Sequence, residues 1–271
     1  MNLFQSIVLG AVQGVTEFLP ISSTAHLILT PWFFGWPDPG LGFDIALHLG
    51  TLVALLLYFR AEWFQLAQGG VALLRGQRRD PNAKLLTFLI LGTIPGLIAG
   101  ALLNNLAETT LRRPMVIASA LIVLALVLVV AERIGRRQTK LEDMSAGDAL
   151  AVGCAQALAI IPGVSRSGIT ITAGLFRGMT REASARFSFF LSTPIIGAAV
   201  SKAIVDGVRH GFPSTDTSAV IAGIVVSGIV GYLSIAFLLR YLATHSTYVF
   251  VYYRIALGIV VIAAYAMGMR L

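Results

Sequence analysis

Long apolar runs alternate with short polar segments from one end of the chain to the other. Six of these runs approach the roughly 20 residues that a helix needs to cross the bilayer core. Charged residues, proline or glycine bound each run, as expected for helix ends. The runs lie at 43–59, 85–103, 114–131, 187–205, 219–240 and 249–269. The pattern predicts an all-α integral membrane protein with about six transmembrane helices.

Two further apolar stretches, 3–30 and 147–178, are interrupted midway by polar segments that contain proline. The interruptions read "FLPISSTAH" and "IIPGVSRSGIT". Irregular backbone at membrane depth is tolerated only where it packs within protein or lines a wet cavity. Each stretch is therefore predicted to form a re-entrant helix pair, which enters and leaves the membrane on the same side.

The single membrane domain, 1–271, divides into two similar halves at about 1–140 and 145–271. Each half has a broken apolar hairpin followed by three spans, and an odd number of crossings inverts the second copy relative to the first. We therefore expect an inverted-topology repeat, with a site near the midplane where the broken helices meet. Three identities at a constant offset of 143 support this pairing: Gly10 with Gly153, Gln13 with Gln156 and Ser22 with Ser165.

Composition and charge agree with a membrane protein. Hydrophobic residues make up 56% of the chain and charged residues only 12%, against about 25% charged in a typical soluble domain. The net charge of +7 comes from basic clusters in short loops, so nucleic-acid binding is not expected. Loops 60–84 and 132–146 are rich in Arg and Lys and belong in the cytoplasm. The loop at 31–42, with the mouth of the first re-entrant pair, then faces outside.

Three smaller expectations follow from single features. The segment "MNLFQSIVLG" has no basic residue, so a cleaved signal peptide is not expected. Cys154 is the one cysteine, which excludes an internal disulfide, and its apolar surroundings predict a small buried helix residue. Glu62 and Glu132 flank basic loops and are expected to be surface charges.

The first break carries a carboxylate and an amide on one helix face. Gln13 and Glu17 are four residues apart, so both side chains point the same way on a helix. A carboxylate within an apolar run is a functional candidate by default. The alternative is a packing glutamine beside a glutamate that snorkels or pairs.

Hydroxyl groups and a histidine follow directly after Pro20. Ser22, Ser23 and Thr24 begin the second helical run, where capping would account for one of the three hydroxyls. His26 is three residues beyond Ser23, on roughly the same helical face. A single membrane histidine is also compatible with simple hydrogen bonding inside a bundle.

The second break adds a permanent positive charge. Its glycines allow close backbone approach, and the helix that follows offers free N–H groups to an anion. The planar fork of Arg166 suits phosphate oxygens, although an arginine here could also snorkel to the cytoplasm. The candidate residues are Ser165, Arg166, Ser167 and Thr170.

Together the two breaks suit phosphoryl transfer, which needs a nucleophile, a proton shuttle and positive groups. A Mg²⁺ or Ca²⁺ ion held by Glu17 and substrate phosphates is a further hypothesis. Asp44 and His48, also four residues apart, could lie near the outer mouth. An acidic residue at a helix start is favourable in any case.

The segments "QGVTEFLPISSTAHLIL" and "PGVSRSGIT" resemble the two signature motifs of undecaprenyl-diphosphate phosphatases, the bacitracin-resistance family. The resemblance covers the whole chain, including "FDIALHLGT". It implies a multi-pass hydrolase of the bacterial cytoplasmic (inner) membrane whose site faces the periplasm or exterior. Such an enzyme converts undecaprenyl diphosphate to undecaprenyl phosphate, recycles this lipid carrier for peptidoglycan synthesis and confers bacitracin resistance.

Under this resemblance, the residues of the second motif and of the serine-rich turn match the family's motifs position by position. We expect Ser23 to attack the terminal phosphate with His26 as its acid/base partner, although a histidine nucleophile would use the same residues in exchanged roles. Glu17 would orient the base or hold the metal, and Gln13 cannot act as a base. The expected catalytic residues are Glu17, Ser23, His26 and Arg166, and the expected substrate-binding residues are Gln13, Ser22, Thr24, Ser165, Ser167 and Thr170.

Two other functions compete with this interpretation. Inverted repeats with broken helices are also a transporter plan, so lipid transport, alone or beside hydrolysis, is the main rival. The type-two phosphatidic-acid phosphatase pattern fits poorly, because Leu106 and Thr172 stand where it needs Lys and His. The expected partners are undecaprenyl diphosphate and the lipid bilayer, and the sequence leaves open whether the protein forms a homodimer.

Overall fold

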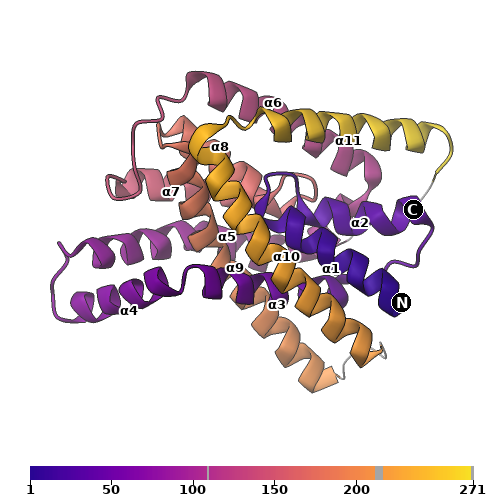
Figure 1. Ribbon diagram of the computed structural model, residues 1–271, viewed down its shortest axis with the longest axis horizontal. Coiled ribbons are helices and arrows are strands. Elements are labelled where there is room, and N and C mark those ends of the chain that lie inside the picture. Colours follow the sequence, from indigo (N-terminus) through magenta and orange to yellow (C-terminus); the bar gives the residue numbers. More distant parts are fainter. Residues whose placement is uncertain (109, 211–215, 270–271) are drawn as a thin grey trace.

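The computed structural model describes residues 1–108, 110–210 and 216–269, and within these ranges it contains helices and no strand (Figure 1). Six long apolar helices among the described residues correspond to the six predicted spans, which confirms an all-α multi-pass membrane protein. In Figure 1, α6 and α11 run side by side. The six helices are α3 (Leu41–Tyr58), α5 (Pro81–Glu108), α6 (Pro114–Ile134), α9 (Arg181–His210), α10 (Thr217–Thr244) and α11 (Tyr248–Ala266).

The two interrupted stretches form pairs of short helices, as their polar breaks predict. The first pair is α1 (Leu3–Phe18) and α2 (Ser23–Phe34). The second is α7 (Ala146–Gln156), extended by the 3-10 helix η2 (Ala157–Ile160), and α8 (Arg166–Phe176). Each half thus has a broken pair before three long helices, the order that the predicted inverted repeat requires.

Two elements lie in segments that the sequence pattern treats as loops. Helix α4 (Arg60–Leu74) occupies much of the basic loop 60–84, and a short 3-10 helix η1 (Thr110–Arg112) precedes α6. In Figure 1, α4 projects from one end of the molecule, while both chain termini lie at the opposite end. The basic loops therefore mark one end of the molecule.

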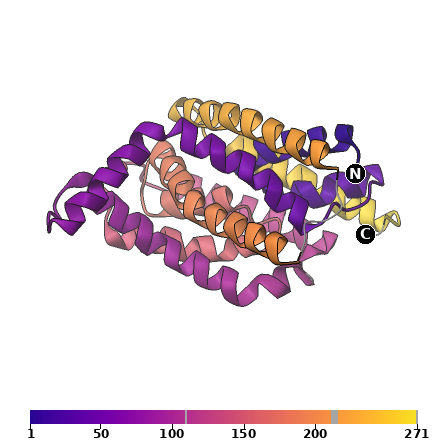
Figure 2. The same ribbon diagram turned by 90° about the horizontal axis from the view of Figure 1, so that it is seen from below.

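Each broken pair packs against a long helix from the other half of the chain. Helix α1 contacts α10, which lies beside it in Figures 1 and 2, and α7 contacts α5. A Cβ on Gly10 would lie 2.5 Å from the carbonyl oxygen of Gly223, and one on Gly153 would lie 2.4 Å from that of Gly92. Only glycine permits such close helix crossings, so these contacts fix the positions of both broken pairs.

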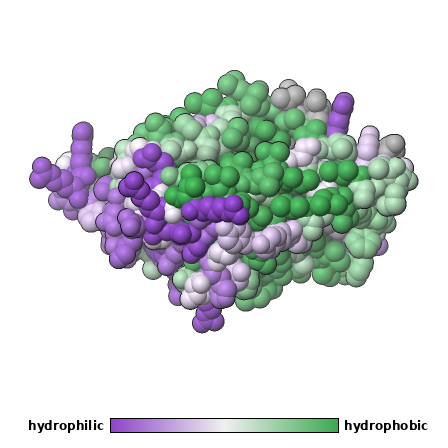
Figure 3. Space-filling view, turned by 90° about the horizontal axis from the view of Figure 1, so that it is seen from above, coloured by the Kyte–Doolittle hydropathy of each residue, from purple (hydrophilic) through white to green (hydrophobic). Residues whose placement is uncertain are grey.

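The buried core lies beside the broken pairs, and the apolar outer surface surrounds it. Phe18 packs edge to face against Phe189, with ring centroids 5.4 Å apart, and Phe59 lies between Phe189 and Phe190. Because Phe18 is the last residue of α1, this packing holds the end of that helix in place. In Figure 3, apolar surface covers most of this face, and hydrophilic surface gathers at the end that carries the basic loops.

Two side chains differ from their expected environments. Cys154 is exposed on α7, because its side chain points away from the helices that cover the other faces of α7. Glu132 is buried, since it forms ion pairs with Arg137 and Arg181 and accepts a 2.8 Å hydrogen bond from Thr247. Compensation by two arginines explains why a carboxylate is stable there.

Candidate active site

Glu17 is the centre of a polar cluster inside the membrane domain. Its carboxylate is buried, 6% exposed, in the last turn of α1. Oε2 accepts hydrogen bonds from Ser23 Oγ at 2.6 Å and from Gln13 Nε2 at 3.1 Å, and His48 Nε2 lies 3.3 Å from it. Arg166 Nη2 lies 3.7 Å from Oε1. Helices α1, α2, α3 and α8 thus converge on one carboxylate.

Two serines 143 positions apart, Ser22 and Ser165, turn the chain into α2 and α8. Ser22 and Ser165 have φ values of +78° and +71°, a left-handed conformation that costs about 1–3 kcal/mol for such residues. Each caps its helix: Ser22 Oγ accepts from the N–H of Ala25, and Ser165 Oγ from that of Gly168. Ser22 Oγ also accepts from the N–H of Gly163 at 3.1 Å. The N-termini of both helices are therefore brought together.

Arg254 on α11 ties the two breaks to each other. Its side chain is fully buried and donates to the carbonyl oxygens of Pro20 at 3.0 Å and Gly163 at 2.8 Å. These two carbonyls are equivalent at the offset of 143. Weaker or longer contacts reach the carbonyls of Leu121 at 3.2 Å, Val164 at 3.3 Å and Ala120 at 3.4 Å. Arg254 was not among the predicted site residues, although a charge within the run 249–269 is a signal of function.

His26 lies near the break but faces Tyr253 on α11. Its Nδ1 is 2.6 Å from the carbonyl oxygen of Ser22, and because a carbonyl only accepts, Nδ1 carries the proton. Nε2 is 2.7 Å from the Tyr253 hydroxyl, and the two rings stack. Among the described residues no hydrogen bond joins Ser23 to His26. In this geometry the hydrogen-bond acceptor for Ser23 is Glu17.

His48 is a further site residue, for which the sequence pattern favoured neither a functional nor a purely structural role. Nδ1 is 2.7 Å from the carbonyl oxygen of Asp44, so it donates there, and Nε2 faces Glu17. Because a carboxylate only accepts, Nε2 can donate to Glu17 only when the ring is protonated at both nitrogens. Asp44 itself is buried, with Arg112 3.9 Å away. The four-residue spacing of Asp44 and His48 was the available signal.

The remaining predicted residues have mostly structural contacts. Ser167 Oγ donates to the carbonyl oxygen of Leu19 at 3.0 Å, another link between the two breaks. Thr170 Oγ1 contacts the Arg166 carbonyl oxygen at 2.7 Å and Ser188 Oγ at 2.6 Å, so its hydroxyl joins α8 to α9. Thr24 is half-buried in the first turn of α2.

Two buried polar atoms of this cluster have no hydrogen-bond partner among the described residues: Arg166 Nη1 and Gln13 Oε1. An unpaired buried donor or acceptor is costly, and at a functional site such atoms indicate where a ligand binds. Nη1 suits a phosphate oxygen. Oε1 suits a cation or water.

A divalent cation fits this cluster only together with a substrate. No group of three or more His, Cys, Asp or Glu residues able to hold a metal occurs in the described part of the chain. Glu17 and the orphaned Gln13 Oε1 supply two oxygen ligands, and Mg²⁺ commonly binds through one or two carboxylates plus substrate phosphates. The donor set is therefore compatible with Mg²⁺ or Ca²⁺ shared with a phosphorylated substrate.

Comparison with known proteins gives a consistent result. The family model described as "Bacitracin resistance protein BacA" matches residues 6–260. The chain is 50% identical over 265 residues to the undecaprenyl-diphosphatase of Moorella thermoacetica, and the match covers 98% of each protein. It is 49% identical to the undecaprenyl-diphosphatase of Gemmatimonas aurantiaca, over 98% of this chain and 99% of the relative. The chain therefore belongs to the bacitracin resistance protein BacA family.

Proposed function

We propose that this protein hydrolyses undecaprenyl diphosphate to undecaprenyl phosphate and inorganic phosphate. The observation that carries the proposal is the convergence of Ser23, Arg166 and two helix N-termini around Glu17. Relatives of about 50% identity are named undecaprenyl-diphosphatase over nearly the whole chain. A site inside the membrane domain also suits this substrate, because the polyprenyl tail can stay in lipid while the diphosphate reaches Glu17.

The short hydrogen bond from Ser23 to Glu17 supports a serine nucleophile. As Ser23 Oγ bonds to the terminal phosphorus, its proton passes to Glu17 Oε2, 2.6 Å away. The bond between that phosphorus and the bridging oxygen breaks, and undecaprenyl phosphate leaves with the electron pair. Water then attacks the phosphorus of the phosphoserine, and the bond between phosphorus and Ser23 Oγ breaks. Glu17 returns its proton to Oγ, and the protons of the water leave with the inorganic phosphate. His26 stabilises the first break through its contacts with the Ser22 carbonyl oxygen and the Tyr253 hydroxyl.

Positive groups face the phosphate from the second break. Arg166 lies 3.7 Å from Glu17, too far for a hydrogen bond, so its guanidinium is available to donate to phosphate oxygens. The first N–H groups of α2 and α8 add the positive ends of two helix dipoles. These fixed donors stabilise the charge that develops on the transferred phosphate.

Several further features belong to the proposal. Gln13 and Glu17 would hold a Mg²⁺ or Ca²⁺ ion shared with the diphosphate, and such an ion would neutralise phosphate charge. We place the protein in the bacterial inner membrane with the site facing outward, because the basic loops favour the cytoplasm. There it would recycle the lipid carrier for peptidoglycan synthesis. A homodimer is compatible with this site, since all its described residues come from one chain.

The direct test is phosphate release from undecaprenyl diphosphate by the purified protein in detergent, with and without EDTA. We expect Glu17→Ala and Arg166→Ala to abolish release, while the exposed Glu142→Ala and Arg240→Ala retain it. Loss of release in EDTA, restored by Mg²⁺ or Ca²⁺, would support the cation. Wild-type release in the Glu17 or Arg166 variant would refute the proposed site. Lipid movement in vesicles without phosphate release would favour transport.

A further inference from the structure

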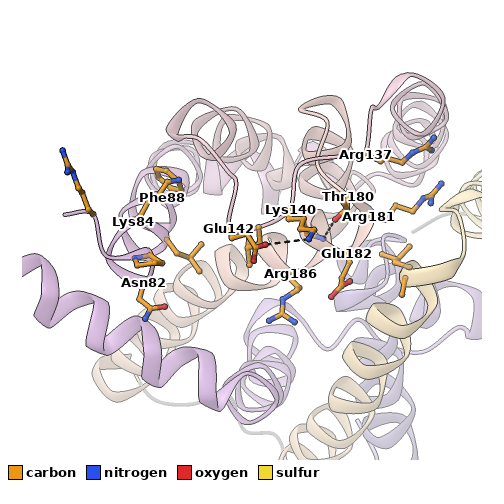
Figure 4. Close-up of a pocket in the computed structure, with 17 residues that line it drawn as sticks. Asn82, Lys84, Phe88, Arg137, Lys140, Glu142, Thr180, Arg181, Glu182 and Arg186 are labelled. Atoms are coloured by element: carbon orange, nitrogen blue, oxygen red, sulfur yellow. Dashed lines mark hydrogen bonds and ion pairs between the residues drawn. The ribbon is translucent and has the colours of Figure 1, made fainter. Parts of the chain in front are cut away.

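A cavity of about 890 Å³ lies at the end of the molecule that carries the basic loops. Figure 4 shows Lys84 and Phe88 from α5 on one side, and Arg137 and Arg181 on the opposite side. The C-terminal end of α10 completes the wall at Leu242.

This cavity is separate from the site at Glu17. Arg186, which lines the cavity, lies over the ring of Phe59 at the end of α3, 5.6 Å from its centroid. His48 contacts Glu17 from an earlier turn of the same helix. Eleven residues of α-helix separate His48 from Phe59, a distance of about 16 Å. The cavity residues therefore take no part in the chemistry proposed above.

Cations outnumber acids around the cavity. Six basic side chains line it, namely Arg79, Lys84, Arg137, Lys140, Arg181 and Arg186, together with the acids Glu142 and Glu182. Glu132 pairs with two of the arginines and Glu62 with a third. Even with these two carboxylates included, six cations face four acids, so the cavity keeps a net positive charge.

Two of the cations have no acidic partner among the described residues. Arg79 forms no ion pair there, and the ammonium of Lys84 lies 5.5 Å from the centroid of the Phe88 ring. The nearby Asp80 is used to cap α5, because its Oδ1 accepts from the N–H groups of Asn82 and Ala83. Arg79 and Lys84 are thus free to bind an anion from outside the chain.

The cavity also has apolar walls, formed by Leu85, Phe88, Leu141 and Leu242. Leu85 and Leu242 lie near the ends of the membrane-spanning helices α5 and α10, where a lipid headgroup meets its acyl chains. A ligand that fits both the basic side chains and the apolar walls of the cavity carries phosphate at one end and hydrocarbon at the other. Basic cavities between membrane helices at the cytoplasmic face commonly bind anionic lipid headgroups.

We propose that this cavity is a binding site for a phosphate group, supplied by an anionic phospholipid of the adjacent leaflet. Arg79 and Lys84 donate to its phosphate oxygens, and Phe88 and Leu85 contact the start of its acyl chains. The site is independent of the proposed hydrolysis, so either idea can fail without the other.

The test measures thermal stabilisation of the purified full chain in a zwitterionic detergent as a ligand is titrated. The ligands are dioleoyl phosphatidylglycerol, dioleoyl phosphatidylcholine and inorganic phosphate. The test variant is Arg79→Gln/Lys84→Gln. The matched control is Arg75→Gln/Arg78→Gln, which removes two exposed charges from the same segment outside the cavity. The Tm of each variant without added ligand, compared with that of the wild type, confirms that the variant is folded.

We expect phosphatidylglycerol to stabilise the wild type and the control variant, and the cavity variant to bind it on the order of thirtyfold more weakly. Phosphatidylcholine should have little effect, because it carries no net charge. Stabilisation by inorganic phosphate alone, lost in the cavity variant, would retain the phosphate site but assign it to a soluble ligand. Equal binding by the cavity and control variants, or equal effects of both lipids, would overturn the proposal.

Discussion

Arg254 gives the sharpest test of how the two breaks are held together. Its guanidinium is fully buried and donates to five carbonyl oxygens, three of them within 3.2 Å. The substitution Arg254→Met keeps much of the side-chain volume and removes all of the donors. Pro20 and Gly163, one in each break, then lose the link between them.

The expected cost follows from the hydrogen bonds and the burial. A hydrogen bond to a charged group contributes about 1.5–3 kcal/mol, so the three shorter bonds total about 4.5–9 kcal/mol. The variant buries no charge, so it avoids a desolvation penalty of several kcal/mol, which offsets part of this loss. We therefore expect a net loss of about 3–5 kcal/mol, which lowers Tm on the order of 10 °C, together with loss of phosphate release as α2 and α8 separate.

The assay is thermal unfolding in detergent, followed beside phosphate release. Arg254→Lys is expected to be intermediate, because an ammonium can reach fewer of the carbonyls. Arg240→Met is the matched control, since Arg240 is exposed near the end of α10. An Arg254→Met protein with wild-type Tm and activity would refute the assigned role.

Three further predictions concern the chemistry and the packing. Glu17→Gln should retain the fold and lower kcat about 10²–10⁴-fold, measured as phosphate release at saturating substrate; a rate within threefold of wild type would contradict a role as base. Ser23→Ala should abolish turnover, and no phosphate should be trapped covalently on the variant protein. Substantial residual activity would exclude the serine nucleophile. Gly10→Ala should lower the unfolding free energy by about 1–3 kcal/mol, because the added Cβ would lie 2.5 Å from a backbone oxygen. Gly100→Ala is the control and should not lower it, because a Cβ there would have nothing within 4 Å. Equal Tm values for these two variants would disprove the close packing of α1 against α10.

The sequence alone determined the number and order of the membrane-spanning helices, because this information is local. Apolar runs of bilayer length and proline-containing interruptions depend on neighbouring residues only, and they predicted all six spans and both breaks. Glu17 and Arg166 were also recognisable, because a charge inside an apolar run is too costly to be there without a function. Helix α4 was missed, since exposed polar helices and basic loops have similar compositions.

Only the tertiary structure decided which polar groups meet. Spacing along a helix placed Gln13 beside Glu17, but it could not show that Ser23 bonds to Glu17 while His26 faces Tyr253. Contacts at the site join residues up to 234 positions apart, and they depend on how long helices pack against each other. The same reason explains Arg254 and His48: their sequence signals were visible, but their roles depend on partners from other helices that no local pattern specifies.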